Sequence, residues 1–213
     1  MGQMRQHGKE IIYVNRYVMY NYSMKIVSIC GSPRKGNSET ILLYLQKLLR
    51  TQGHENEIIL LREKNISRCH GCVEYCNRNH KCRIDDDMSS LLDTYVSGDA
   101  YIVVSPNYFQ MPTGILKDFI DRSSILNSQN REEHFKHKKA VVITIGTDTL
   151  ENVGNCANVI GDNYFSEIGL TKVLKKSFHS RSELKGNLND VFENGLNKNI
   201  IKDLKECVEY LIK

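Results

Sequence analysis

The chain has 213 residues, of which 29 are basic and 25 acidic, for a formal net charge of +4. This length suits one α/β domain with a full core. The nearly balanced charge, without a long basic run, gives no indication of a nucleic-acid partner. No stretch of about 18 consecutive apolar residues marks a membrane span. The first residues carry no secretory signal, so we expect a cytoplasmic protein.

Residues 1–23 are polar and rich in tyrosine, unlike the rest of the chain. We interpret them as an N-terminal extension that is either disordered or an arm packed on a neighbouring subunit. Met24 opens the first predicted strand. We expect residues 24–213 to form a single domain, with a cysteine-rich insertion at 67–87, and to assemble as a homodimer or homotetramer.

The segment from Lys25 to Leu49 predicts a strand, a loop and a helix. Residues 25–30 form a short apolar run typical of a buried parallel strand. Apolar residues from Ile41 to Leu49 recur at helical spacing. The loop between them, 31–40, is rich in Gly, Ser and Asn. Curled backbone N–H groups and a helix N-terminus together make an anion site.

The composition of the 31–40 loop narrows the choice of anion. It contains neither GxxxxGK[ST] nor GxGxxG, which argues against a nucleoside triphosphate and a dinucleotide. A hydroxyl-rich loop at the first strand-to-helix turn suits a terminal phosphate monoester such as that of FMN. The alternative is a plain connection in which Ser or Asn caps the helix.

The remaining hydrophobic pattern alternates between strands and helices. Further strands are predicted at 58–61, 101–104, 140–145 and 170–178, the last less hydrophobic, as at a sheet edge. Further helices are predicted at 88–96, 115–120, 153–168 and 200–212. We interpret 62–87 as a loop and 127–139 as a solvated surface loop, and make no assignment for 180–198. This order predicts an α/β fold, a doubly wound parallel sheet with helices on both faces.

Ligands of such sheets bind beyond the carboxyl ends of the strands. Three loops leave that edge, at 31–40, 105–113 and 146–150, and all are rich in small or polar residues. We expect the functional site there. Other polar residues receive structural interpretations: Asp118, Asp121 and Arg122 as surface charges of a helix or a subunit contact, and His179 as a structural histidine.

Seven cysteines without an export signal indicate thiols or metal ligands, not disulfides. Cys69, Cys72, Cys76 and Cys82 follow the spacing C-x₂-C-x₃-C-x₅-C. Thiolates so close together suit an iron–sulfur cluster or zinc. Alternatively, the first three, at i, i+3 and i+7, pack as small thiols on one helix face. We expect the remaining three, Cys30, Cys156 and Cys207, to be core thiols.

Three stretches carry a family resemblance: GSPRKGNSET after the first strand, SPNYFQMPTGILKDFIDR after the third, and CHGCVEYC followed by a later cysteine and DDM. Together they resemble the flavodoxin-like NAD(P)H-dependent FMN reductases, in the branch that includes iron–sulfur flavoproteins. The resemblance covers roughly residues 24–178. One departure is an extra residue between the second and third cysteines.

The resemblance implies a flavodoxin-like fold with five strands in the order 2-1-3-4-5 and noncovalently bound FMN. It implies electron transfer from NAD(P)H through FMN to a quinone, a small acceptor or a protein partner. The alternatives are an iron–sulfur electron carrier reduced by a ferredoxin-type protein, and a zinc- or thiol-based redox sensor without turnover. The implied FMN-binding residues are Ser32, Arg34, Asn37, Ser38, Thr40, Pro106, Asn107, Tyr108, Phe109, Met111, Gly146 and Thr147. The implied ligands of a [4Fe–4S] cluster are Cys69, Cys72, Cys76 and Cys82.

Overall fold

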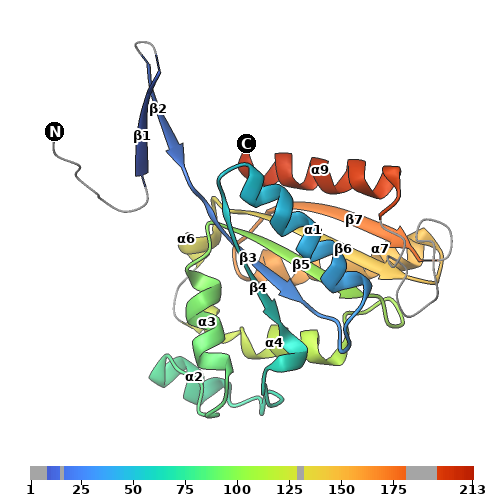
Figure 1. Ribbon diagram of the computed structural model, residues 1–213. Helices are drawn as coiled ribbons and strands as arrows, with labels where there is room; N and C mark the ends of the chain where they lie inside the picture. Colours follow the sequence, from blue (N-terminus) through green and yellow to red (C-terminus); the bar gives the residue numbers. More distant parts are fainter. Residues whose placement is uncertain (1–8, 15–16, 129–131, 181–195) are drawn as a thin grey trace.

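The computed structural model describes residues 9–14, 17–128, 132–180 and 196–213 (Figure 1). Its centre is a five-stranded parallel sheet in the order β4-β3-β5-β6-β7, which is 2-1-3-4-5 by chain order. The predicted fold class and strand order are therefore confirmed, and β7 lies at an edge as expected. The strands are β3 (Lys25–Cys30), β4 (Glu55–Leu60), β5 (Ala100–Pro106), β6 (Lys139–Gly146) and β7 (Lys172–His179).

Helices cover both faces of the sheet, and each face has its own apolar core (Figure 1). On one face, α1 (Asn37–Thr51) and α9 (Lys198–Ile212) pack on the inward side chains of β3, β5 and β6. The other face is covered mainly by α3 (Met88–Val96), α4 (Gly114–Arg122) and α7 (Leu150–Asn158). No described helix is long and apolar enough to cross a membrane.

Short helical segments occupy several connections. They are η1 (Leu61–Glu63), α2 (Val73–Asn79), α5 (Ile125–Ser128), α6 (Glu132–Phe135), η2 (Val159–Tyr164) and α8 (Phe165–Glu167). Two of them correct loop predictions, since α2 lies within 62–87 and α6 within 127–139. The surface-loop interpretation of 127–139 is wrong at Phe135, which is fully buried. Its ring packs against Tyr95 and Tyr101, with centroids 5.8 and 5.6 Å away.

Two element boundaries also differ from the prediction. The second strand of the sheet was expected at 58–61, but β4 begins at Glu55, and Leu61 opens the 3₁₀ turn η1. As an edge strand, β4 exposes Glu55 and Glu57, so its first half has no apolar run to reveal it. The helix expected over 153–168 begins at Leu150 and widens into the π-helix η2, continuing as α8.

The described part of the N-terminal extension is an antiparallel hairpin of β1 (Lys9–Val14) and β2 (Tyr17–Tyr22). Among the described strands, these two pair only with each other. Figure 1 shows the hairpin standing away from the central sheet, next to the start of β3. Residues 1–8, which the disordered-or-arm interpretation also includes, lie outside the described residues.

Candidate functional site

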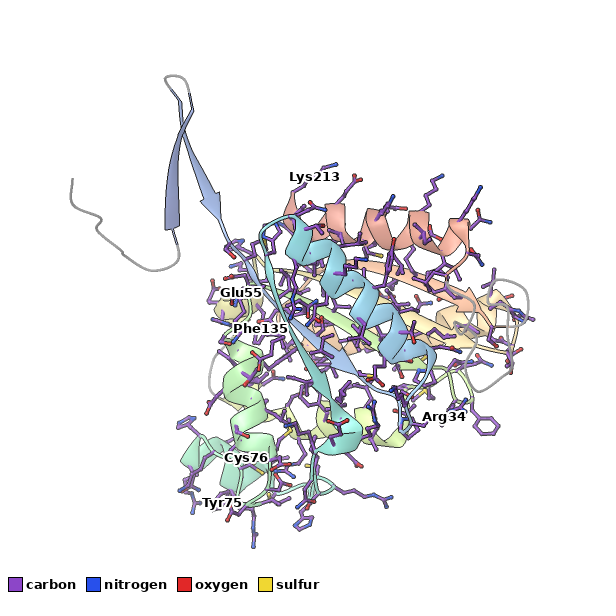
Figure 2. The ribbon with its side chains drawn as sticks, viewed as in Figure 1. Arg34, Glu55, Tyr75, Cys76, Phe135 and Lys213 are labelled. Atoms are coloured by element: carbon purple, nitrogen blue, oxygen red, sulfur yellow. The ribbon has the colours of Figure 1, made fainter. Side chains whose placement is uncertain are left out.

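The loop between β3 and α1 is organised by its own backbone and by α4. Ser32 donates its hydroxyl to the Arg34 carbonyl at 2.7 Å and accepts from the Arg34 N–H at 3.3 Å, which curls the loop. Gly31 donates to the Val104 carbonyl at 2.8 Å, fixing the loop to β5. Figure 2 shows Arg34 at the end of the sheet, on the loop that leads into α1.

The start of α4 lies directly against this loop. Thr113, the N-cap of α4, donates its buried hydroxyl to the Gly31 carbonyl at 2.5 Å and accepts from the Leu116 N–H. A Cβ atom on Gly31 would lie 2.8 Å from Leu116 Cδ2. Any larger residue at this position would force the Leu116 side chain of α4 to move.

A cavity of about 150 Å³ lies where β3, β5 and β6 end. Pockets that enclose a whole cofactor usually measure about 300–1,000 Å³. This cavity is therefore smaller than a pocket that encloses a whole cofactor and is of a size for a phosphate group and its chain. Ten of its twelve lining residues come from the three predicted loops: Ser32, Arg34, Gly36, Asn37, Ser38, Pro106, Asn107, Tyr108, Gly146 and Thr147. The other two are Ile145, in β6, and Ser180, just after β7.

Two residues that line the cavity each have a buried polar side-chain atom without a hydrogen-bond partner among the described residues. These atoms are Asn107 Oδ1 and Ser180 Oγ. Both belong to residues held firmly by their backbones: Asn107 N–H donates to the Ile145 carbonyl and Ser180 N–H to the Gly146 carbonyl, each at 2.7 Å. Leaving such atoms unpaired is unfavourable, so their positions fit a polar ligand such as the phosphate and ribityl hydroxyls of FMN.

The 106–112 loop carries a tight turn at the mouth of the cavity. Tyr108 and Met111 exchange two backbone hydrogen bonds of 3.1 and 3.0 Å. The two residues between them have positive φ angles, +52° for Phe109 and +64° for Gln110. Asn155 holds the turn by donating to Gln110 Oε1 at 2.7 Å. Such angles are uncommon for bulky residues and concentrate at functional loops.

Nine of the twelve predicted cofactor residues line the cavity. Of the other three, Thr40 lies in the first turn of α1, and its N–H donates to the Gly36 carbonyl. Phe109 is 98% exposed, and Met111 also points largely to solvent. The predicted set omitted three lining residues: Gly36, Ile145 and Ser180. The polarity of Ser180 just after the last strand was the available signal for it, next to His179, which does not line the cavity.

The four-cysteine segment lies at a distance from this cavity, beside α3 and α4. Figure 2 shows Cys76 on α2, well apart from Arg34. The expectation that Cys69, Cys72 and Cys76 share one helix face is wrong, because α2 begins only at Val73. Cys69 is exposed, and Cys72, Cys76 and Cys82 are half-buried. The predicted core thiols Cys30, Cys156 and Cys207 are buried, as expected.

Of the four thiols, Cys76 has its pKa raised by its surroundings. Partial burial raises the pKa of Cys76, and the neighbouring Cys72, followed by Cys82 and Cys69, raises it further. The Gly71 N–H donates to Cys69 Sγ at 3.4 Å. This donor set has the soft chemistry that iron–sulfur clusters and zinc require. However, no three His, Cys, Asp or Glu side chains within the described ranges are grouped closely enough to hold a metal ion.

Arg122 corrects a second prediction, because it is not a surface charge. Its side chain and that of Asp86 are each 1% exposed and form a bidentate ion pair with distances of 2.7 and 2.9 Å. Burial alone would raise the pKa of Asp86, but hydrogen bonds from Arg122 and from the Ser67 and Met88 N–H groups lower it to about 2. By contrast, Asp121 lies at the surface and pairs with Lys117.

Comparison with known proteins identifies the family. Residues 24–153, more than half of the chain, match the family of NADPH-dependent FMN reductases. An iron–sulfur flavoprotein of Archaeoglobus fulgidus is 34% identical over 62% of this chain and 62% of its own length. A second, from the same organism, is 29% identical over 88% of this chain and 97% of its own. The predicted resemblance is thereby confirmed.

A solved structure shows the same fold. It is an FMN-dependent NADH-azoreductase from Bacillus anthracis in complex with FMN, with a TM-score of 0.63 over 89% of this chain and 100% of that one. At 15% identity, this likeness supports the fold alone. The match to the family agrees with the strand order 2-1-3-4-5 and with a cavity formed where the strand-end loops meet. The chain belongs to the NADPH-dependent FMN reductase family.

Proposed function

We propose that the chain is an FMN-dependent oxidoreductase that takes electrons from NADH or NADPH and passes them to a quinone, another small acceptor or a protein. The observation that carries this proposal is the cavity at the three strand ends, whose lining residues Asn107 and Ser180 each have a buried side-chain oxygen without a protein partner among the described residues. Membership of the FMN reductase family supports the same cofactor.

The residues of the cavity have distinct tasks in this proposal. Ser32, Asn37 and Ser38 would bind the phosphate with the N–H groups at the start of α1, and Arg34 would supply positive charge. Tyr108, at the mouth, would offer an aromatic surface to the flavin ring. The chemistry that FMN supplies when bound is acceptance of a hydride from the nicotinamide and onward transfer of electrons. The protein orients the partners and needs no side-chain acid or base for this.

The phosphate assignment is tested by replacing Arg34 and Asn37 with Ala. Each charge-assisted contact is worth about 1.5–3 kcal/mol, so the double variant, which loses two, should bind FMN at least about 100-fold more weakly while keeping its fold. Arg50→Ala, at the opposite end of α1, is the matched control for losing an arginine. Unchanged FMN affinity in the Arg34→Ala/Asn37→Ala variant would disprove this placement.

The activity is tested by anaerobic stopped-flow mixing of the FMN-loaded protein with NADH or NADPH. We expect bleaching of the flavin absorbance with at least one of them. If neither nucleotide bleaches the flavin but a reduced ferredoxin-type protein does, this proposal is wrong and the chain is an electron carrier.

A second candidate function is supported by the relatives that are named iron–sulfur flavoproteins and by the spacing of four cysteines within fourteen residues of the sequence. In it, Cys69, Cys72, Cys76 and Cys82 would gather to hold a [4Fe–4S] cluster, which would supply one-electron transfer when bound. Anaerobic iron and sulfide analysis tests it: about four of each per chain supports the cluster. Zinc in place of iron, or neither metal, would favour a structural or sensing role for the thiols.

We also propose a homodimer or homotetramer, in which residues 1–23 serve as an arm. The support is the β1–β2 hairpin, which finds no strand partner in the described part of its own chain. An isolated two-stranded hairpin is only marginally stable in water. Light scattering of the full chain and of a variant lacking residues 1–22 tests this proposal. If both proteins have the same number of subunits, the hairpin is not the arm that joins them.

A further inference from the structure

One carboxylate lies at the start of α1, where the proposed phosphate would bind. Glu39 is the only acidic residue of the 31–40 loop and belongs to the first turn of α1. The Thr40 N–H donates to the Gly36 carbonyl, so the N–H groups just before Thr40 have no acceptor within the helix. A negative side chain in this turn is attracted to the same N–H groups as an anionic ligand. Glu39 therefore competes with a phosphate for this site unless its charge is held elsewhere.

Arg62 contacts that carboxylate from the neighbouring strand end. Cys30 and Leu60 are paired in the parallel register of β3 and β4, so the 31–40 loop and η1 leave the same edge of the sheet from adjacent strands. Arg62, in η1, places Nη2 3.1 Å from Glu39 Oε2. The two side chains are only 17% and 14% exposed, so their attraction is screened less than that of a surface pair.

The contact between Arg62 and Glu39 is one of charge. Glu39 Oε2 is buried and accepts no hydrogen bond from the described residues, although the Arg62 charge lies beside it. Arg62 Nη1 is also buried without a hydrogen-bond partner in the described part of the chain. Its Nη2 donates to Glu63 Oε1 at 3.0 Å, and the Glu63 side chain is 59% exposed. The arrangement thus supplies a partly buried positive charge at Glu39, with Glu63 as a second and more exposed partner.

We propose that Arg62 is a positioning residue for the cofactor phosphate, which holds and neutralises Glu39 so that the start of α1 stays open to a phosphate monoester. The inference rests on the proposed binding of the FMN phosphate at this turn. Without Arg62, the Glu39 carboxylate would turn toward the N–H groups of its own helix. It would also repel the phosphate, which carries a charge of about −1.5 to −2 at pH 7. Arg62 therefore contributes to a preference for FMN over riboflavin, which has the same ring system and no phosphate.

The test is the affinity of the FMN-free protein for FMN and for riboflavin, followed by the quenching of flavin fluorescence. Arg62→Gln should bind FMN about tenfold more weakly than wild type, because it leaves the Glu39 charge uncompensated. Its affinity for riboflavin should be unchanged. Arg62→Lys keeps the positive charge and should recover most of the loss. Glu39→Gln should bind FMN at least as tightly as wild type.

A double-mutant cycle shows whether Arg62 acts through Glu39. In the Glu39→Gln background no carboxylate is left to neutralise, so Arg62→Gln should then weaken FMN binding by less than about threefold. An arginine that attracts the phosphate directly would lose the same factor in both backgrounds. The coupling between the two residues therefore separates positioning from direct attraction.

Two control variants address lost charge, and a third measurement addresses lost stability. Arg50→Gln removes an arginine from the last turn of α1, and Glu63→Gln removes the exposed partner of Arg62. Neither should change the ratio of the FMN and riboflavin affinities. Urea unfolding of each FMN-free variant reports whether it is folded, and the result for Glu39→Gln stands even if Arg62→Gln does not fold.

Each outcome decides the inference. A tenfold loss of FMN affinity in Arg62→Gln that falls below about threefold in the Glu39→Gln background supports it. An equal loss in both backgrounds overturns it, as does weaker FMN binding in Glu39→Gln. Equal losses of FMN and riboflavin affinity in Arg62→Gln also overturn it, since the phosphate is then not involved.

Failure of the inference is distinguishable from failure of the proposed phosphate site. If Arg34→Ala/Asn37→Ala weakens FMN binding and Arg62→Gln does not, the inference is wrong and the phosphate site stands. If wild type binds FMN and riboflavin equally well, the phosphate site and the inference both fail. Reduction of the bound flavin by NADH or NADPH is measured separately and is unaffected by either result.

Discussion

The Arg122–Asp86 pair predicts a specific dependence of stability on pH. Asp86 has its pKa lowered from 3.8 to about 2 in the folded protein. A carboxyl whose pKa is depressed by folding stabilises the protein at pH values above its unfolded pKa. That stabilisation disappears as pH falls through the folded pKa. The shift corresponds to about 2 kcal/mol of unfolding free energy at neutral pH, of which roughly half is lost by pH 3.

The perturbation is Asp86→Asn, compared with wild type by urea unfolding at pH 7 and at pH 3. At pH 7, the variant should be less stable by about 3–5 kcal/mol, because the buried Arg122 charge loses its partner. At pH 3, the difference between the two proteins should shrink by about 1 kcal/mol, since wild type alone loses the contribution of Asp86. Other titrating groups are common to both proteins and cancel in the difference.

Asp121→Asn is the control for this experiment. Asp121 pairs with Lys117 at the surface, so its replacement should change unfolding free energy by less than about 1 kcal/mol at either pH. A difference between wild type and Asp86→Asn that stays constant from pH 7 to pH 3 would refute the reasoning. It would mean that the ion pair does not depress the pKa of Asp86.

Three further variants test the cavity at the strand ends and the turn at its mouth. Gly31→Ala places a methyl group 2.8 Å from Leu116 Cδ2, so it should lower unfolding free energy by about 1–3 kcal/mol and weaken FMN binding, both measurable by calorimetry with and without FMN. Ser180→Ala removes a buried hydroxyl that has no partner among the described residues. The binding free energy of FMN should weaken by about 0.5–1.5 kcal/mol, while the FMN-free protein loses no stability. A destabilised FMN-free variant would contradict this. Phe109→Gly relieves a positive φ at a residue that is 98% exposed, so urea unfolding should show a gain of about 0.5–1 kcal/mol; a loss would show that the ring makes stabilising contacts.

The strands of the sheet interior could be predicted from the sequence because they are buried on both faces. β3, β5 and β6 have almost entirely buried residues and therefore read as continuous apolar runs. β4 lies at the edge, where alternate positions are exposed, and half of it was missed. The helix α6 was missed because one buried ring, Phe135, stands in an otherwise charged stretch.

The candidate site was predictable where loop composition and strand order determine position. Loops that follow parallel strands gather at one edge, so residues such as Asn37, Asn107 and Gly146 were expected together and line one cavity. The same argument applies to Ser180, which follows the last strand, but no assignment was made for 180–198; its exact place depends on a backbone bond to the Gly146 carbonyl of β6, a contact distant in sequence. Nor could it show that Arg122 is buried, since its partner Asp86 comes from a distant loop.

Contacts at both ends of helix α4 fix the number of residues between them. At its start, Thr113 is bonded to the Gly31 carbonyl, and at its end, Arg122 is bonded to Asp86. A residue inserted between them would turn Arg122 by about 100° around the helix axis and shift it by about 1.5 Å, away from its partners. Insertions in the connections before 113 or after 122 leave both ends in place. Among related chains, we therefore expect residues 113–122 to keep a fixed length while the flanking loops vary.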